Sequence, residues 1–429
     1  VDMPMEVLLG KAPRMHREVK HVEAALPEFT AEGIDLAKAV KDVLRHPTVA
    51  GKSFLITIGD RTVGGLVHRD QMVGPWQVPV ADAAVTNISF LDNRGEAMAM
   101  GERTPLAIAN APAASRMAIG EAITNIVSAD IDLRLVKLSA NWMAACGTDG
   151  EDAKLYDAVQ AASDVCQKLG IAIPVGKDSL SMKTTWEADG EKKSVTSPVS
   201  LIVSAAAPVG DVRLSLTPQL KTDKPSLLVA IDLGHGKNRM AGSILSQVTQ
   251  QFGSATPDLD NTDELKAFVK MVRKLTLAGC VMSYHDRSDG GLLATVAEMM
   301  FAGHTGVTRA LDSMTASSKA EDVIGALFNE ELGAVLQVPV DRIDEVFAEV
   351  KASGFAHCTH FIGTLNQDDK LIIQAHDEVV YEEERGALQQ AWSEVSWQIA
   401  RRRDNPACAD QEYARCTAKD DTGLFVRTT

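Results

Sequence analysis

The sequence predicts an α+β protein with two main domains. At 429 residues, the chain is longer than one typical hydrophobic core supports. Short apolar runs, typical of strands, alternate with stretches whose apolar residues recur at helical spacing, and no exact short repeat is present. Residues 208–225 are rich in Pro, Lys, Thr and Asp and show neither strand nor helix periodicity. This indicates a boundary between the two domains.

Composition and charge indicate a globular cytoplasmic protein. A hydrophobic share of 45% and a charged share of 24% are ordinary values for this class. The net charge of -15 argues against a nucleic-acid or anionic-membrane surface, and no apolar run approaches the ~20 residues needed to cross a bilayer. The first residues lack a signal-peptide design. The six cysteines form no C-x-x-C pair, so we expect reduced thiols.

The first half of the chain predicts an irregular start followed by a mixture of strands and helices. Residues 1–30 contain three prolines that interrupt any helix, and we interpret them as a connector. Amphipathic patterns predict helices over 34–44, 111–128 and 152–169, the last ended by Gly170. Gly59, Asp60 and Arg61 are expected to form a hairpin turn between the first two strands. The expected strands are 53–58, 62–67, 78–85, 96–100, 133–140, 171–175 and 200–207.

The second half predicts a further set of strands and helices. Helices are expected near 238–251, 262–278 and 341–352, and one amphipathic helix over 382–403, whose three leading glutamates complement its dipole. A polar tail, 404–429, follows. The expected strands are 227–233, 281–284, 334–338, 360–365 and 371–374.

Residues 281–303 carry the clearest site motif. An apolar strand, 281–284, leads into HDRSDGG, and a helical pattern follows. A strand end, a glycine pair and a helix N-terminus place free N–H groups at one point, where proteins commonly bind phosphate. Asp286 and Asp289 beside such an anion suggest a divalent cation. The alternative is a helix capped by Ser288 or Asp289, with no ligand.

Two further places carry candidate ligand groups. Asp82 ends an expected strand, and Glu121 and Asn125 are spaced i, i+4 on one face of the 111–128 helix. Their oxygens suit Mg²⁺, although a solvated polar face would give the same pattern. In GKDSLSMK, 176–183, a lysine and serines follow a strand and would suit an oxyanion, or simply a lysine-capped turn. The P-loop glycine is missing there, and the histidines show no zinc-site spacing.

Seven motifs occur in order along the chain: GDRTVGGLVHRDQMVGPWQVPVADAAVT (59–86), GEAMAMGERTP (95–105), GEAITN (120–125), VKLSANWM (136–143), PVGKDSLSMKT (174–184), HDRSDGGL (285–292) and FNEELGAVLQV (328–338). Together they resemble phosphoribosylformylglycinamidine synthase, the formylglycinamide ribonucleotide amidotransferase of purine biosynthesis, in its large single-chain bacterial form. That family has a small N-terminal domain, two tandem A/B units of the aminoimidazole ribonucleotide synthetase type, and a glutaminase.

The resemblance implies a domain plan. Residues 1–30 would leave the preceding unit, and residues 31–212 would form the second A-type domain, a mixed sheet with helices. Residues 213–380 would form the second B-type domain, an α/β domain, and residues 381–429 would lead into a glutaminase. The resemblance thus implies a fragment without the first A/B unit and the glutaminase, and the chain does not begin with Met. No cysteine lies in a nucleophile-elbow context.

The resemblance also implies an activity and a site. The family uses ATP to phosphorylate the amide oxygen of formylglycinamide ribonucleotide, and ammonia from glutamine displaces the phosphate. One of its two nucleotide sites is catalytic, and the other holds ADP with Mg²⁺. The motifs assign this chain to the ADP-holding site, so none of its residues is called catalytic. The implied residues are Asp82, Glu121, Asn125 and Asp286 as magnesium ligands, Ala81 and Ser288 as ADP or ATP contacts, and Lys177, Ser179 and Ser181 as substrate or phosphate contacts.

Three functions therefore remain open. The chain would be part of the amidoligase and inactive by itself, or a nucleotide-holding structural module without turnover, or a self-sufficient ATP-dependent enzyme similar to aminoimidazole ribonucleotide synthetase. A lone A-type domain would expose the sheet face that pairs in the family, so we expect a homodimer through that face.

Overall fold

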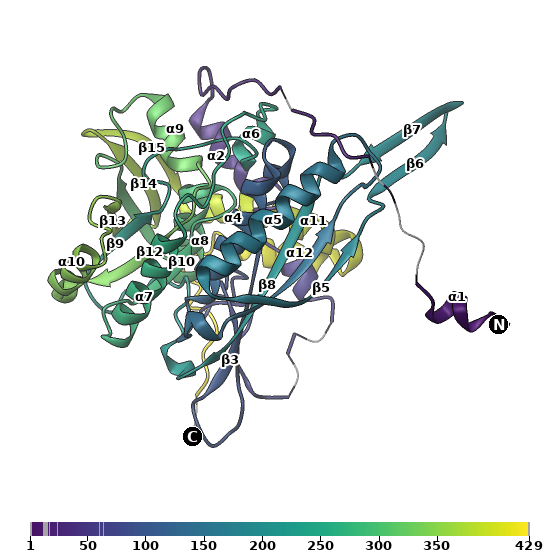
Figure 1. Cartoon of the computed structure of the whole chain (residues 1–429). Helices are drawn as coiled ribbons and strands as arrows, with labels where there is room; N and C mark the ends of the chain where they lie inside the picture. Colours follow the sequence, from purple (N-terminus) through teal and green to yellow (C-terminus); the bar gives the residue numbers. More distant parts are fainter. Residues whose placement is uncertain are drawn as a thin grey trace.

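The computed structural model describes residues 2–11, 16, 18–23, 25–59, 61–62 and 64–427. Two helix-covered sheets form the body of the molecule, and a two-stranded hairpin projects from it (Figure 1). The strand order is β1-β2-β3-β8-β4-β5 in the first sheet and β10-β12-β9-β13-β11-β14-β15 in the second. None of the described helices has the length and apolar character needed to cross a membrane.

The first sheet is covered on one face by two long helices, α4 (Ala111–Ile126) and α5 (Glu151–Leu169). Alternation along its third strand buries Ala97 and Ala99 against α4 and leaves Met98 and Met100 exposed on the other face. The strands are β1 (Val67–Arg69), β2 (Ala84–Asn87), β3 (Gly95–Glu102), β4 (Lys137–Met143), β5 (Ala172–Ser179) and β8 (Ser200–Val209). The projecting hairpin consists of β6 (Lys183–Ala188) and β7 (Glu191–Thr196).

Three adjacent strands of the second sheet, β10, β12 and β9, are buried on both faces. Alternate residues of β9 enter two different cores: Val229 and Ile231 join the core that contains α4 and α5, and Leu228 and Ala230 join the other. The core that contains α4 and α5 is therefore shared by both sheets. The strands are β9 (Ser226–Asp232), β10 (Ser283–Asp286), β11 (Gly306–Ala310), β12 (Gly333–Pro339), β13 (Thr359–Asn366), β14 (Lys370–Ala375) and β15 (Glu378–Glu384).

The remaining helices surround this second sheet or extend from the body. Figure 1 shows α7 and α10 beside one another at one side of the sheet and the short α1 at the N-terminal end, away from the body. The helices are α1 (Met5–Leu9), α2 (Leu36–Arg45), α3 (Ser53–Ile56), α6 (Ile244–Val248), α7 (Thr262–Leu277), α8 (Gly291–Gly303), α9 (Ala320–Phe328), α10 (Ile343–Ala352), α11 (Arg385–Arg403) and α12 (Pro406–Arg415).

Segments from both ends of the chain pack on the second core. Val40 and Leu44 of α2 and Leu388 and Trp392 of α11 are buried together with α8. The backbone N–H of Gly51 donates to the Trp392 carbonyl at 2.9 Å. These amphipathic helices therefore bury their apolar faces in the same core as α8, and the domain limits at residues 31 and 381 stay predictions.

Several predicted strands are wrong. Residues 53–56 form α3, because a short apolar run does not by itself distinguish helix from strand. The predicted turn includes Asp60, which lies outside the described residues. Among the described residues of the strand predicted over 62–67, only Val67 lies in a strand, β1. Strand β2 begins only at Ala84, and β5 continues to Ser179. The glutamates 382–384 lie in β15, which was missed together with β6 and β7 because polar residues occupy most of their positions.

Candidate functional site

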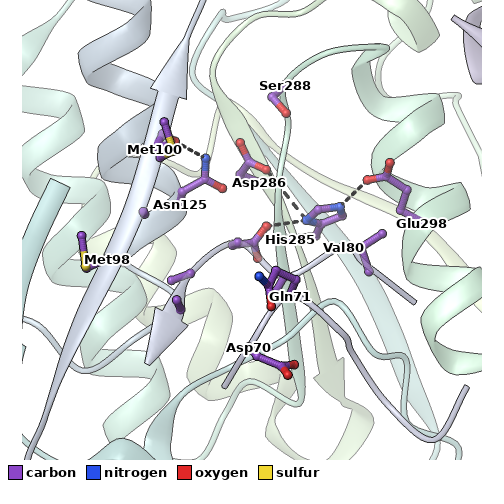
Figure 2. Close-up of a pocket in the computed structure, with 15 residues that line it drawn as sticks. Asp70, Gln71, Val80, Met98, Met100, Asn125, His285, Asp286, Ser288 and Glu298 are labelled. Carbon is purple, nitrogen blue, oxygen red and sulfur yellow. Dashed lines mark hydrogen bonds and ion pairs between the residues drawn. The ribbon is translucent and has the colours of Figure 1, made fainter. Parts of the chain in front are cut away.

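A cavity of about 410 Å³ lies where the end of β10 meets the segment before β2 and the edge of β3. Five of the six residues implied as metal or nucleotide contacts line it (Figure 2). They are Ala81, Asp82, Asn125, Asp286 and Ser288. The structure thus brings together residues that are distant in the sequence, since Asp82 contacts His285 across a separation of 203 positions.

Two buried carboxylates form the centre of the site. Asp82 Oδ1 lies 2.6 Å from His285 Nδ1, and Asp286 Oδ1 lies 3.8 Å from the same nitrogen. Within the described part of the chain, the second oxygens of Asp82 and Asp286 have no hydrogen-bond partner. Buried carboxylate oxygens without a partner are costly, and hard oxygen atoms in such a position suit Mg²⁺.

The electrostatics of this pair also fit a bound cation. Burial, together with the neighbouring Asp82 carboxylate, raises the pKa of Asp286 to about 8. Burial likewise raises the pKa of Asp82, and His285 only partly offsets it. Since a divalent cation favours the charged form of both groups, its binding would lower both pKa values and so oppose these shifts.

His285 is held between carboxylates on both sides. Its Nε2 lies 2.8 Å from Glu298 Oε2 on α8 (Figure 2). Glu298 Oε1 accepts from Trp392 Nε1 at 3.0 Å. Burial lowers the pKa of His285, but Asp82 and Glu298 outweigh burial and hold the pKa well above its usual range. A charged His285 therefore orients Asp82. Glu298 was not among the predicted site residues, although a single carboxylate in an otherwise apolar helix is a usable signal.

The predicted pair on α4 faces the sheet rather than solvent. Glu121 is only 8% exposed, and its Oε2 accepts from the Glu102 backbone N–H at 2.8 Å. Asn125 Nδ2 donates to the Met100 carbonyl at 3.0 Å, so its amide oxygen is left for the cavity side (Figure 2). Burial raises the pKa of Glu121 well above its usual range. The solvated-face alternative is therefore wrong, and Glu121 stands behind the cavity, outside the lining that the described residues define.

The start of α8 is held by a carboxylate of the protein itself. Glu330 Oε1 accepts from the backbone N–H groups of Gly290 and Ile244, both at 2.8 Å. Its Oε2 lies 2.7 Å from Arg103 Nη2, and Arg103 Nη1 lies 3.4 Å from Asp289 Oδ1. The alternative of a helix capped by Ser288 or Asp289 is wrong: Gly290 occupies the N-cap position, at φ 82°, without a described side-chain cap.

The three predicted substrate contacts lie elsewhere. Lys177 and Ser179 belong to β5, the edge strand of the first sheet, and Ser181 follows directly. Lys177 Nζ donates to Ser179 Oγ at 2.6 Å at an exposed position. The cavity lining, as far as the described residues define it, contains none of the three. The lysine-capped turn is also wrong, because Lys177 lies inside a strand.

Two family models match the chain. Residues 51–208 match the FGAR-AT PurM_N-like domain, and residues 228–376 match the C-terminal domain of AIR synthase related proteins. The two matches correspond to the two sheets in chain order. They confirm the predicted fold class, a mixed sheet with helices followed by an α/β domain.

Solved structures show the same fold at low sequence identity. Thermotoga maritima PurL complexed with FGAR superposes with a TM-score of 0.60 at 12% identity, over 83% of this chain and 54% of that one. Phosphoribosylformylglycinamidine synthase II from the same organism gives 0.58 at 12%, over 83% and 52%. Its PurL complexed with ADP gives 0.54 at 12%, over 74% and 47%. The chain spans about half the length of these proteins. Over residues 51–376 it therefore consists of a PurM-like N-terminal domain followed by an AIR-synthase-related C-terminal domain.

Proposed function

We propose that this chain is the second A/B unit of phosphoribosylformylglycinamidine synthase and that it holds ADP or ATP with Mg²⁺. The observation that carries the proposal is the pair of unpartnered buried oxygens on Asp82 and Asp286, in one cavity with Asn125 and Ser288. Similarity to PurL structures solved with ADP and with FGAR supports the ligand class.

Each residue of the site has a proposed task. Asp82, Asp286 and Asn125 would bind Mg²⁺, with Glu121 behind them, and the ion would neutralise phosphate charge. Ala81 and Ser288 would contact the nucleotide. His285, held by Glu298, is a positioning residue that fixes the Asp82 carboxylate.

In the complete enzyme, the reaction would convert formylglycinamide ribonucleotide, glutamine and ATP to formylglycinamidine ribonucleotide, glutamate, ADP and phosphate. Phosphoryl transfer depends on positioning and charge neutralisation, which this site would supply to a nucleotide. Lys177, Ser179 and Ser181, on the edge strand, remain proposed substrate or phosphate contacts completed by another unit. A nucleotide-holding structural module is the second candidate, favoured by the position of the cavity between residues of both sheets.

Heat denaturation of the purified chain, followed by chromatography of the released small molecules, tests the proposal. We expect ADP in stoichiometric amount, or ADP binding by calorimetry when Mg²⁺ is added to nucleotide-free protein. Absence of both would reject nucleotide holding.

The chain by itself should not make the amidine. With ATP, formylglycinamide ribonucleotide and ammonium, we expect no product above background in a chromatographic assay. Ammonium bypasses the glutaminase, so the test isolates the contribution of the first A/B unit. Nucleotide holding without turnover agrees with the proposal, whereas robust ammonia-dependent turnover would support the self-sufficient enzyme instead.

The open face of the first sheet should mediate self-association. Met98 and Val175 are 58% and 62% exposed on that face, and exposed apolar surface of this kind favours an interface. We expect a dimer of the 46.0 kDa chain in size exclusion with light scattering. Val175→Lys should shift the equilibrium to monomer, and Leu277→Lys, at an exposed position on α7, should not. A wild-type monomer throughout the micromolar range would contradict this prediction.

A further inference from the structure

A second cluster of metal-binding side chains lies apart from the nucleotide cavity. The ligand atoms of His235, His357 and Cys358 all lie within 4.8 Å of one another. His235 belongs to the turn after β9, and His357 and Cys358 belong to the turn before β13. We propose that these three side chains bind a zinc-class transition-metal ion, a site independent of the proposed nucleotide function.

The backbone brings the two turns together. Asp232, the last residue of β9, accepts from the N–H groups of Gly234 and Gly236 at 3.0 and 2.7 Å and so shapes the first turn. Its own N–H donates to the Cys358 carbonyl at 2.8 Å, which joins the two turns. The cluster therefore rests on the paired ends of two neighbouring strands, β9 and β13, rather than on free loops.

The distance between the two imidazole nitrogens is close to that in a tetrahedral site. His235 Nδ1 and His357 Nε2 lie 3.0 Å apart. With Zn–N bonds of about 2.0–2.1 Å, two nitrogens of a tetrahedral site lie about 3.3 Å apart. Binding would replace the hydrogen bond between the rings. His357 would take the tautomer that carries its proton on Nδ1, so that both nitrogens offer a lone pair to the ion.

A carboxylate already supports the first histidine from behind. Glu264 Oε2 on α7 lies 2.7 Å from His235 Nε2. Histidines that bind metal almost always donate their other ring N–H to such a partner, which fixes the tautomer and makes the coordinating nitrogen more basic. With the proton on Nε2, His235 Nδ1 is free to coordinate.

The donor set selects the class of ion. Two imidazoles and a thiolate suit Zn²⁺ or Co²⁺, whereas Mg²⁺ prefers the oxygen atoms around Asp82. Coordination would release the Cys358 thiol proton to solvent. His357 is exposed and Cys358 is buried, so the site opens to solvent on the imidazole side, and a water would complete four-coordination. Local sequence spacing hides this site, because 122 positions separate the two histidines.

Titration of the purified chain with Co²⁺, with Mg²⁺ in large excess to occupy oxygen sites, tests the proposal. We expect one equivalent of Co²⁺ to bind, with thiolate-to-cobalt charge-transfer absorption that Zn²⁺ abolishes by displacement. Cys358→Ser should remove the absorption, His357→Ala should weaken binding, and Glu264→Gln should weaken it by about 10–100-fold.

Cys408→Ser is the matched control, because Cys408 is an exposed thiol far from the cluster in sequence. This variant should retain the absorption and the stoichiometry. His357 is exposed, so His357→Ala should fold normally, and circular dichroism verifies this. Absence of the absorption in the wild type, its persistence in Cys358→Ser, or unchanged affinity in a folded His357→Ala variant would each overturn the proposal.

Discussion

Replacement of Arg103 by Met should destabilise the protein by about 3–5 kcal/mol, the usual cost of removing one partner from a buried ion pair. Arg103 is 4% exposed and lies 2.7 Å from Glu330, which is 1% exposed. Glu330 in turn holds the start of α8 and the N–H of Ile244. Without Arg103, the Glu330 carboxylate is buried with no cation beside it.

This loss should depend on pH. Burial raises the pKa of Glu330 to about 7 even though Arg103 lowers it, and removal of Arg103 should raise that pKa further. In the unfolded chain, Glu330 has an ordinary glutamate pKa of about 4.3 and has released its proton near neutral pH. The folded variant keeps that proton. Stability from this group therefore falls as pH rises from about 4.3 through the folded pKa. The deficit should be smaller at about pH 5 than at about pH 8.

Urea denaturation followed by circular dichroism measures both effects. Arg94→Met, which removes an exposed ion pair with Asp92, is the matched control and should change little. The double variant Arg103→Met with Glu330→Gln should lose less than the sum of the single changes, because the introduced glutamine side chain is neutral and its amide oxygen still accepts the two N–H groups. A loss below about 1 kcal/mol for Arg103→Met would contradict the buried-pair account.

The spacing of apolar residues along the sequence predicted the long helices. The helices α4, α5 and α8 follow from apolar spacing, and α5 ends at Gly170, which adopts φ 73° as a helix stop requires. Strands were less predictable. The residues of β6 and β7 are mostly polar and exposed, so no alternation marks them. Conversely, the apolar residues 53–56 form a helical turn.

Some residues of the candidate site could be predicted from the sequence, and others could not. Asp82 and Asp286 were visible because each is a carboxylate within a recognisable motif. Trp392 was not visible, and Glu298 showed only as a lone carboxylate in an apolar helix, because their contacts with each other and with His285 arise only in the fold. The same reason hides the pair of His235 and His357. Arg103 and Glu330 lie within two quoted motifs, yet 227 positions separate them, and only the structure shows their pairing.

Replacement of Asp286 by Asn should abolish stabilisation by Mg²⁺ and ADP without weakening the ligand-free protein. For the wild type, ligand at ~100 times its Kd should add about 2.7 kcal/mol. Asn has the shape of Asp but lacks the charge that binds the ion, so most of this increment should disappear. Thermal unfolding in buffer, with Mg²⁺ alone, with ADP alone and with both measures the increment.

The ligand-free comparison distinguishes a binding role from a structural one. Burial and Asp82 raise the pKa of Asp286 to about 8. In the folded protein near neutral pH, this carboxyl group is therefore either charged in an unfavourable environment or protonated. Both states cost free energy relative to the unfolded chain, and a neutral amide avoids that cost. Asp286→Asn should therefore unfold at the same temperature as the wild type or higher. Asp92→Asn, at an exposed position, should keep the full ligand increment. An Asp286→Asn protein that retains the increment would exclude Asp286 as a ligand. If Asp286→Asn instead lowers the stability of the ligand-free protein, the carboxylate has a structural role. A carboxylate that serves only to bind a ligand is not expected to stabilise the ligand-free fold.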